Sequence, residues 1–415
     1  MKKTILTLVM SASIMFTMAA DLYVNGSGNA NTYPTIQGAV NASSSGDNIY
    51  VATVGTYSEN VTITNKTLFI VAAVADEQFT LSGSFTLSPG TGNEVTIIGM
   101  YNGNVTCSGT GGTVNLISSF ISSITGSSYK LNVYDCEVTN TFTMKNGSVK
   151  GNEIDRLIVN SGGTTGDTVR IMGNYMTSLN WNSSTVYFEI CNNFIDGASS
   201  VSYEDQAVRI DNLEDTPGGT NLFSNNTVSF DVNGQNGGSY GYNNCSYPAS
   251  NYNYNYGALV FSYNYTSQGQ NLVIVSNYFK NMDINRGWAI NISSYNSSSS
   301  ISNALIANNY YSCCNLYWGN MFSNSSLVDN GSSAVTWTFN PTTGILTSGT
   351  NLGLDQIEYR DINNTRNDIG TSGGPHAWSN YNTTTGKAAV FNLELPFQLY
   401  IGGNHNIKAK GFHKN

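Results

Sequence analysis

The sequence predicts an all-β solenoid, a parallel β-helix whose coils each add one short strand to each sheet. Short β-branched or aromatic runs recur between Gly, Asn and Ser turns, and the steps from Ile97 to Leu116 and from Leu116 to Val133 are 19 and 17 residues. Charged residues are only 10% of the chain, against roughly 25% in ordinary soluble proteins. Order must therefore come from strand ladders and stacked side chains rather than from ion pairs.

The first 20 residues predict a secretory signal. Residues 1–3 are Met-Lys-Lys, residues 4–18 are mostly apolar, and Ala19 and Ala20 precede a cleavage site before Asp21. We therefore expect a secreted or cell-surface protein. No later window holds about 18 uninterrupted apolar residues, so no membrane span is expected. The net charge of −9 gives no attraction to phosphate backbones, so nucleic acid is not an expected partner either.

Residues 21–48 predict an N-terminal strand and a capping helix. Ile36, Ala39 and Val40 fall at i, i+3 and i+4 after Pro34 and Thr35, which gives a short helix one apolar face to bury. Strand-like runs follow at 49–51, 61–63 and 68–71.

Three motifs in this region, TIQGAV at 35–40, GDNIYV at 46–51 and GTYSENV at 55–61, resemble the N-terminal entry of the pectin lyase-like superfamily. That resemblance implies a right-handed parallel β-helix with a short N-terminal capping helix and a small C-terminal strand unit. It implies no specific activity.

Residues 49–350 are predicted to form the β-helix itself. An Asn-rich turn marks its coils at Asn174, Asn193, Asn226, Asn277 and Asn309, with spacings of 19, 33, 51 and 32 residues. Asn tolerates the left-handed backbone of such turns, and stacked Asn side chains can bond to the coils above and below. The wider spacings predict loop insertions near 196–220 and 231–257, where function is expected because solenoid loops project without disturbing the core.

The first insertion holds the densest group of carboxylates in the chain. Arg209, Asp205 and Asp211 are the candidate catalytic residues of a polysaccharide lyase, and Asp211, Glu214 and Asp215 are candidate ligands for calcium. The chain lacks the lyase and polygalacturonase signatures, so the alternative is that these carboxylates are solvated or hold a structural calcium ion. No cofactor is required by either interpretation.

The second insertion consists almost entirely of Asn, Gly, Ser and Tyr. Pyranose C–H faces stack on aromatic rings while amides meet sugar hydroxyls, so its tyrosines predict a glycan-binding surface. The candidates are Tyr240, Tyr242, Tyr252, Tyr254 and Tyr256. The alternative is a low-complexity loop without a ligand.

Two residue types are assigned structural roles. The 55–61 segment resembles an early motif of pectin methylesterases, but their catalytic residues have no counterpart here, so Glu59 is expected to accept backbone N–H bonds in a turn. Cys136 and Cys191 lie in strand-like runs and are expected inside the coil as small apolar residues rather than in disulfides.

Residues 351–415 predict a closing segment and a C-terminal β-strand cap. The alternating run 389–395 ends at Pro396, and a hairpin turn is expected near 402–405. An exposed strand edge here is the alternative, and it would serve attachment or self-association.

Three functions therefore remain open: a structural or adhesive surface protein that contacts polysaccharide or cell-surface glycan, a polysaccharide lyase or related carbohydrate-active enzyme, and a self-associating surface filament subunit.

Overall fold

The structure is a computed structural model, and it describes most of the chain up to residue 230 and separate segments beyond it. The described residues are 19–24, 31–74, 77–126, 128–197, 207–214, 218–230, 257–261, 269–281, 288–292, 301–312, 315–317, 322–323, 325–328, 330–332, 339–340, 345–346, 349–356, 359–361, 363, 365–374, 377, 387–394 and 408–414.

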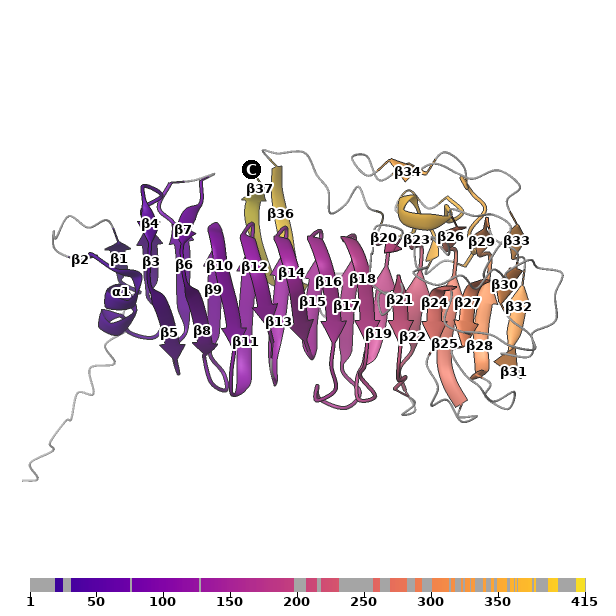
Figure 1. Cartoon of the computed structure of the whole chain (residues 1–415), viewed down its shortest axis with the longest axis horizontal. Helices are drawn as coiled ribbons and strands as arrows, with labels where there is room; N and C mark the ends of the chain where they lie inside the picture. Colours follow the sequence, from indigo (N-terminus) through magenta and orange to yellow (C-terminus); the bar gives the residue numbers. More distant parts are fainter. Residues whose placement is uncertain are drawn as a thin grey trace, which may run out of the picture.

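Two long sheets, parallel throughout, run side by side along an elongated body, so the chain is an all-β parallel β-helix (Figure 1). The strands of the first sheet are β2 (Thr32–Tyr33), β1 (Asp21–Val24), β3 (Asn48–Val51), β6 (Leu68–Ala72), β9 (Glu94–Ile98), β11 (Thr110–Ile117), β13 (Ser128–Tyr134), β15 (Asn146–Lys150), β17 (Thr168–Met172), β19 (Tyr187–Cys191), β22 (Asn221–Ser224), β25 (Gly269–Val275), β28 (Ile301–Ala307), β31 (Phe322–Ser323) and β32 (Ser326–Val328).

The second sheet carries the other strands of each coil. They are β4 (Thr56–Tyr57), β5 (Asn60–Thr64), β7 (Phe79–Leu81), β8 (Ser84–Ser88), β10 (Met100–Cys107), β12 (Phe120–Thr125), β14 (Glu137–Met144), β16 (Glu153–Val159), β18 (Tyr175–Trp181), β20 (Phe194–Asp196), β21 (Val208–Ile210), β23 (Thr227–Phe230), β24 (Gly257–Phe261), β26 (Tyr278–Asn281), β27 (Trp288–Ile292), β29 (Tyr310–Tyr311), β30 (Asn315–Tyr317) and β33 (Gly331–Ser332). β18 pairs with both β20 and β21. In the coils after β18, two short strands therefore take the place of one longer strand.

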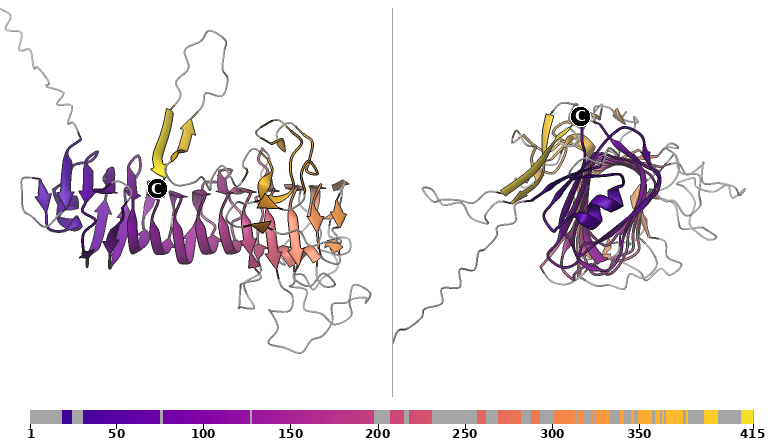
Figure 2. Two further views of the ribbon diagram at one scale, coloured as in Figure 1. Left: turned by 90° about the horizontal axis from the view of Figure 1, so that it is seen from above. Right: turned by 90° about the vertical axis from the view of Figure 1, so that its left-hand side faces the viewer.

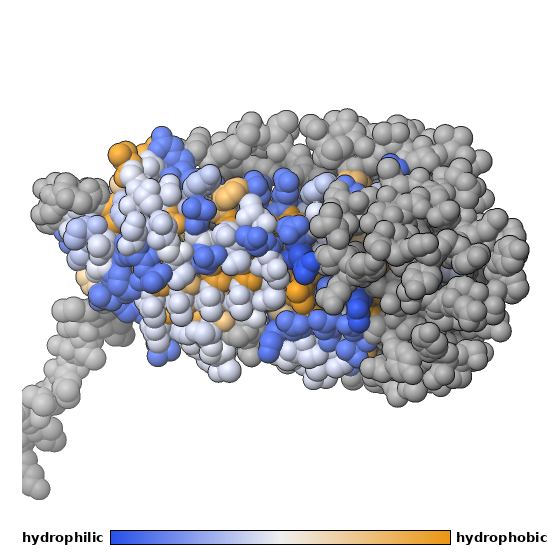
Figure 3. Space-filling model, in the orientation of Figure 1, coloured by the Kyte–Doolittle hydropathy of each residue, from blue (hydrophilic) through white to orange (hydrophobic). Residues whose placement is uncertain are grey.

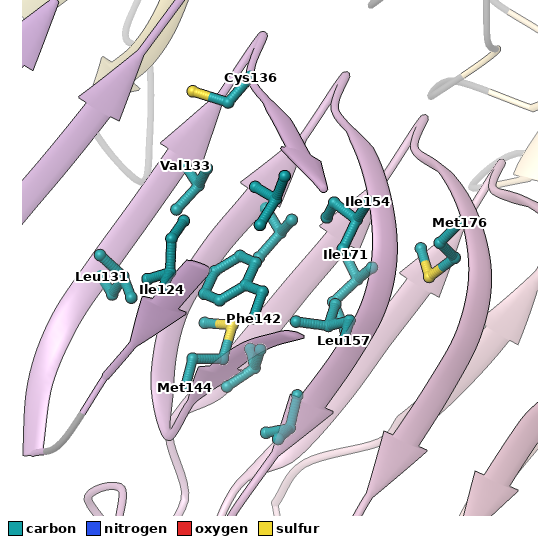
Figure 4. Close-up of a cluster of buried hydrophobic side chains, with 14 of the residues drawn as sticks. Ile124, Leu131, Val133, Cys136, Phe142, Met144, Ile154, Leu157, Ile171 and Met176 are labelled. Atoms are coloured by element: carbon teal, nitrogen blue, oxygen red, sulfur yellow. The ribbon is translucent and has the colours of Figure 1, made fainter. Parts of the chain in front are cut away.

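The core is built from columns of aliphatic side chains at matching register. Ile49, Ile70, Ile97, Leu116 and Val133 follow one another on adjacent strands, and each is 0% exposed. Side chains alternate between the two faces of a strand, so each coil contributes an inward apolar residue at the same height. Figure 4 shows such residues from consecutive strands filling the interior. The coils therefore share one continuous core.

The predicted capping helix is confirmed as α1 (Ile36–Ala42). Its buried residues are Ile36, Ala39 and Val40, and Thr35 caps it by accepting a bond from the N–H of Gly38. The end-on view of Figure 2 shows α1 inside the outline of the coil.

Glu59 accepts backbone N–H bonds as expected, but at the helix start. Its two carboxylate oxygens receive the N–H groups of Ile36 and Gln37 at 2.8 and 2.9 Å. A carboxylate satisfies the free N–H donors of a helix N-terminus, so Glu59 fixes the capping helix α1 to the first coil.

A ladder of buried asparagines links the coils, as the Asn-rich turns predict. The backbone N–H and the Nδ2 of Asn174 both donate to Oδ1 of Asn193, over 3.0 and 2.9 Å. The same two bonds recur between successive members of the ladder, which are Asn152, Asn174, Asn193, Asn226, Asn277, Asn309 and Asn330. The predicted spacings of 19, 33, 51 and 32 residues are the steps of this ladder.

The cysteines that the structure describes are free and buried, which confirms the interpretation of Cys136 and Cys191. Cys107 is the third of them. Figure 4 shows Cys136 beside core residues.

We expect these three thiols to be unreactive towards a thiol reagent in the folded protein. Burial raises the pKa of each thiol from 9.0 to about 12, so the reactive thiolate is scarce at neutral pH. Because the unfolded thiols ionise at lower pH than the folded ones, these groups also make unfolding easier as the pH rises from 9 towards 12. Labelling with and without denaturant, followed by peptide mapping, checks this. Rapid native labelling of Cys136 or Cys191 would contradict it.

The C-terminal region contains two antiparallel strand pairs. The described parallel strands end at Ser332, and β34 (Phe339–Asn340) pairs antiparallel with β35 (Ile345–Leu346). Further on, β36 (Lys387–Glu394) pairs with β37 (Lys408–Lys414) in a sheet of their own, and the predicted turn at 402–405 lies outside the described residues. Both views place the pair of β36 and β37 beside the middle of the solenoid rather than over its last coil (Figures 1 and 2).

The residues between β35 and β36 include a closing segment, which we define as residues 349–374. This closing segment packs against the turns of several coils. Asn225 Nδ2 donates to Oδ1 of Asn367 and to the carbonyl of Asp368, and Asn192 Nδ2 donates to the carbonyl of Thr371. Asn192 and Asn225 have φ values of 56° and 53°. The left-handed turn residues, each directly before a ladder asparagine, therefore hold the closing segment.

Among the described residues, no helix has the length and apolar character needed to span a membrane.

Candidate functional site

Arg209, the central residue of the predicted lyase site, lies on a strand and not on a loop. It is the middle residue of β21, between the buried Val208 and Ile210, because the apolar pair alternates with it across the sheet. The Nε of Arg209 lies 2.6 Å from Oδ1 of Asp211, and both side chains are partly exposed. Arg209 and Asp211 are thus brought together, as an ion pair.

Glu214 is buried, at 3% exposure, so it is not the solvated loop carboxylate that the alternative expected. Its backbone carbonyl accepts a bond from Asn221 Nδ2 at 2.8 Å. Within the described part of the chain, no group of three or more His, Cys, Asp or Glu side chains is placed to hold a metal ion. The other predicted site residues lie outside the described residues: Asp205, Asp215, Tyr240, Tyr242, Tyr252, Tyr254 and Tyr256.

The second sheet carries a straight line of aromatic and acidic residues that sequence reasoning missed. Each member is the Cα partner of the next on the neighbouring strand. We call this line the aromatic–glutamate row, and its members are Tyr101, Phe120, Glu137, Glu153, Tyr175 and Phe194.

The row faces outward because its neighbours in sequence point inward. Ile121, Val138 and Ile154 each follow a member of the row directly, and each is at most 1% exposed. Tyr101 is 42% exposed, while Phe194, at the other end, is 9% exposed. Adjacent strands lie about 4.8 Å apart, so six consecutive positions span about 24 Å along the solenoid. That length suits an extended polymer rather than a small metabolite.

Aromatic pairs stand at both ends of the row. The rings of Tyr101 and Phe120 stack with centroids 4.8 Å apart and planes 27° apart. Tyr175 and Phe194 have centroids 5.4 Å apart and planes tilted by 46°. Both distances match one strand spacing, so the stacking follows directly from the register.

Two carboxylates occupy the centre. Glu137 and Glu153 are exposed and sit on adjacent strands. Partial burial, and then the charge of Glu153, raise the pKa of Glu137 above its usual value. Like charges directly opposite each other on two strands are destabilising. This pair therefore lowers the stability of the fold, and packing does not explain its presence.

The carboxylate of Asp196 extends the acidic character towards Tyr175. The Tyr175 hydroxyl donates to Oδ2 of Asp196 at 3.4 Å. Burial, followed by the charges of Asp196 and Glu153, raises the pKa of Tyr175. The ring of Tyr175 is therefore held in place with its hydroxyl neutral.

The closing segment ends the exposed part of the row. The register continues from Phe194 to Thr227 and Tyr278, but both of these residues are 0% exposed. Tyr278 packs against Ile369 and Leu346, and Thr227 Oγ1 accepts the N–H of Thr371. The open row is thus bounded at its C-terminal end by chain that returns from far along the sequence.

The face of the molecule in Figure 3 is mostly hydrophilic or neutral over the described solenoid, with small apolar areas between strands.

Comparisons with protein-family models, with curated proteins and with solved structures find no match.

Proposed function

We propose that this chain is an exported β-helix protein with a structural or adhesive role, which contacts polysaccharide through the aromatic–glutamate row. The observation that carries the proposal is the row itself, in which the outward rings of Tyr101, Phe120 and Tyr175 flank two outward carboxylates in one register. Phe194, at 9% exposure, supports the ring of Tyr175 from the side. Sugar rings present C–H faces that stack on aromatic rings, and their hydroxyls bond to carboxylates and amides. The resemblance to pectin lyase-like proteins and the N-terminal signal pattern support the same assignment.

The row suits repeated weak contacts better than tight binding of one sugar. Each stacked ring contributes about 1 kcal/mol, so a few sugar units bind weakly and a long polymer or several copies bind usefully. The strands also hold the rings in fixed positions, which lowers the entropy lost on binding. The tyrosines of the second insertion, which lie outside the described residues, stay a separate candidate for glycan contact.

We expect the Tyr101→Ala/Tyr175→Ala variant to bind oligosaccharides about thirtyfold more weakly than wild type, because one ring is lost from each aromatic pair. Calorimetry on a panel of neutral, basic and acidic hexasaccharides measures this. Tyr23→Ala/Tyr50→Ala is the matched control, since Tyr23 is 43% exposed and stacks on Tyr50 at 5.4 Å on the other sheet. Equal affinity of the row variant and wild type would remove the row as the binding element.

A lyase acting on acidic polysaccharide is the second candidate, favoured by the outward position of Arg209 beside Asp211. The ion pair counts against Arg209 as a base, because a guanidinium held by a carboxylate keeps its proton. Release of unsaturated uronates by wild type but not by Arg209→Ala would favour the enzyme. The free edges of β36 and β37 are the candidate for attachment to the cell or for self-association.

A further inference from the structure

The charge of the aromatic–glutamate row restricts the kind of polysaccharide it can take, and this inference rests on the proposed function. The two carboxylic acids of the row are Glu137 and Glu153, and the row contains no basic residue. Asp155 adds a third carboxylate, two residues beyond Glu153, where Oδ1 accepts the hydroxyl of Thr177 at 2.9 Å. Asp196 adds a fourth beside Tyr175. The outer face around the row is therefore acidic over several strands.

No basic group of the described chain neutralises the central pair. Neither Glu137 nor Glu153 makes a hydrogen bond or an ion pair through its carboxylate with any described residue. The nearest basic residue on these strands is Arg156, which is aligned with Thr141 and Ser178 and has partners of its own. The pair is left to be satisfied by water or by a ligand.

The spacing of the two carboxylates also fits a polymer that carries one positive charge on each sugar unit. Glu137 and Glu153 are one strand spacing apart, about 4.8 Å, which is comparable with the length of one sugar unit in an extended chain. A polymer stacked on the aromatic pairs at both ends would then place successive sugars over successive carboxylates. A uronate polymer would bring like charges together, and a neutral polymer would leave the mutual repulsion of Glu137 and Glu153 in place.

We propose that the row selects a polysaccharide whose sugars carry free amino groups, with Glu137 and Glu153 holding the ammonium groups and the aromatic pairs holding the pyranose rings. An ammonium group placed between the carboxylates offsets the repulsion of two like charges aligned on adjacent strands and gains charge-assisted hydrogen bonds. An ammonium over a tyrosine face gains a cation–π contact as well. Glu137 and Glu153 are in this sense the residues that determine specificity.

The test compares three 1,4-linked hexasaccharides of equal length: a β-linked glucosamine oligomer, its N-acetylated form and an α-linked galacturonate oligomer. Binding is measured by calorimetry at about pH 5.5, where amino sugars are protonated and ordinary carboxyl groups are ionised. We expect wild type to bind the glucosamine oligomer about tenfold more tightly than the N-acetylated one, and the preference to shrink at high salt. The Glu137→Gln/Glu153→Gln variant should bind both with equal affinity.

The matched control is Asp167→Asn/Asp355→Asn, which removes the same number of charges from exposed carboxylates elsewhere. It should keep the preference of wild type, which separates the local effect from that of net charge. Persistence of the preference in the glutamine variant would overturn the inference, and so would equal or tighter binding of galacturonate, with or without calcium. Absence of binding to all three oligomers would overturn the proposed function and this inference with it, whereas binding without preference overturns this inference alone.

Discussion

Replacing Asn193 with leucine is expected to lower the free energy of unfolding by about 3–5 kcal/mol, because several buried polar groups lose their partners at once. Asn193 Nδ2 donates to the carbonyls of Ile171 and Cys191 at 2.8 and 3.0 Å. Its Oδ1 accepts two bonds from Asn174, and the residue is 0% exposed. Leucine has a similar volume, so the loss reflects hydrogen bonding rather than a cavity.

Denaturant unfolding followed by circular dichroism measures the effect of Asn193→Leu. Asn140→Leu is the control, because Asn140 is exposed and makes a single side-chain bond to Ser122 at 3.2 Å. The control should change stability by no more than about 0.5 kcal/mol. A loss below about 1 kcal/mol for Asn193→Leu would show that water or the neighbouring coils replace the ladder bonds.

The sequence predicts the fold because its strongest signals are local and repeat. The apolar face of α1 and the Asn-rich turns can be read within one coil, and the structure confirms both. The sequence alone does not show how the two residues of each turn divide their roles. In the turn at Asn192 and Asn193, the first Asn adopts the left-handed backbone and the second enters the ladder. That division depends on the coils above and below.

The aromatic–glutamate row could not be found in the same way. Its members lie 16 to 22 residues apart, as Glu137 to Glu153 and Glu153 to Tyr175 show, so no fixed period aligns them. Each is also an ordinary outward residue on an alternating strand. The register between coils, which depends on the length of every intervening turn, is what brings them together. The only sequence signal was the position of each residue next to an inward apolar one, such as Met100 before Tyr101 and Val138 after Glu137.

The return of the closing segment could not be found from the sequence for a related reason. It is held by contacts with coils 78 to 181 residues away along the chain. The contact of Asn192 with Thr371 is one example. No local pattern encodes such a contact.

The closing segment is expected to be a separately releasable unit. Ile369 is 0% exposed and packs against Tyr278 and Leu346, apart from the main core. Leu352 packs against the same cluster, and hydrogen bonds add to it. Asn225 donates to the segment, and Ser276 Oγ accepts the N–H of Leu354 at 2.9 Å. A small apolar cluster that anchors a segment by itself is where local opening starts.

Ile369→Ala should therefore destabilise the closed position of this segment by about 2–4 kcal/mol, with a smaller effect on the solenoid. Tryptic cleavage after Arg366, whose Nε now donates to the carbonyl of Gly353 at 2.7 Å, should accelerate about thirtyfold or more, since cleavage follows the population of the open form. Leu327→Ala is the control, because Leu327 is 42% exposed on β32 and its truncation should leave the rate unchanged. If Ile369→Ala instead lowers the global unfolding midpoint while cleavage after Arg366 stays slow, the closing segment unfolds only together with the coils, and Tyr278 is then part of the main cooperative unit.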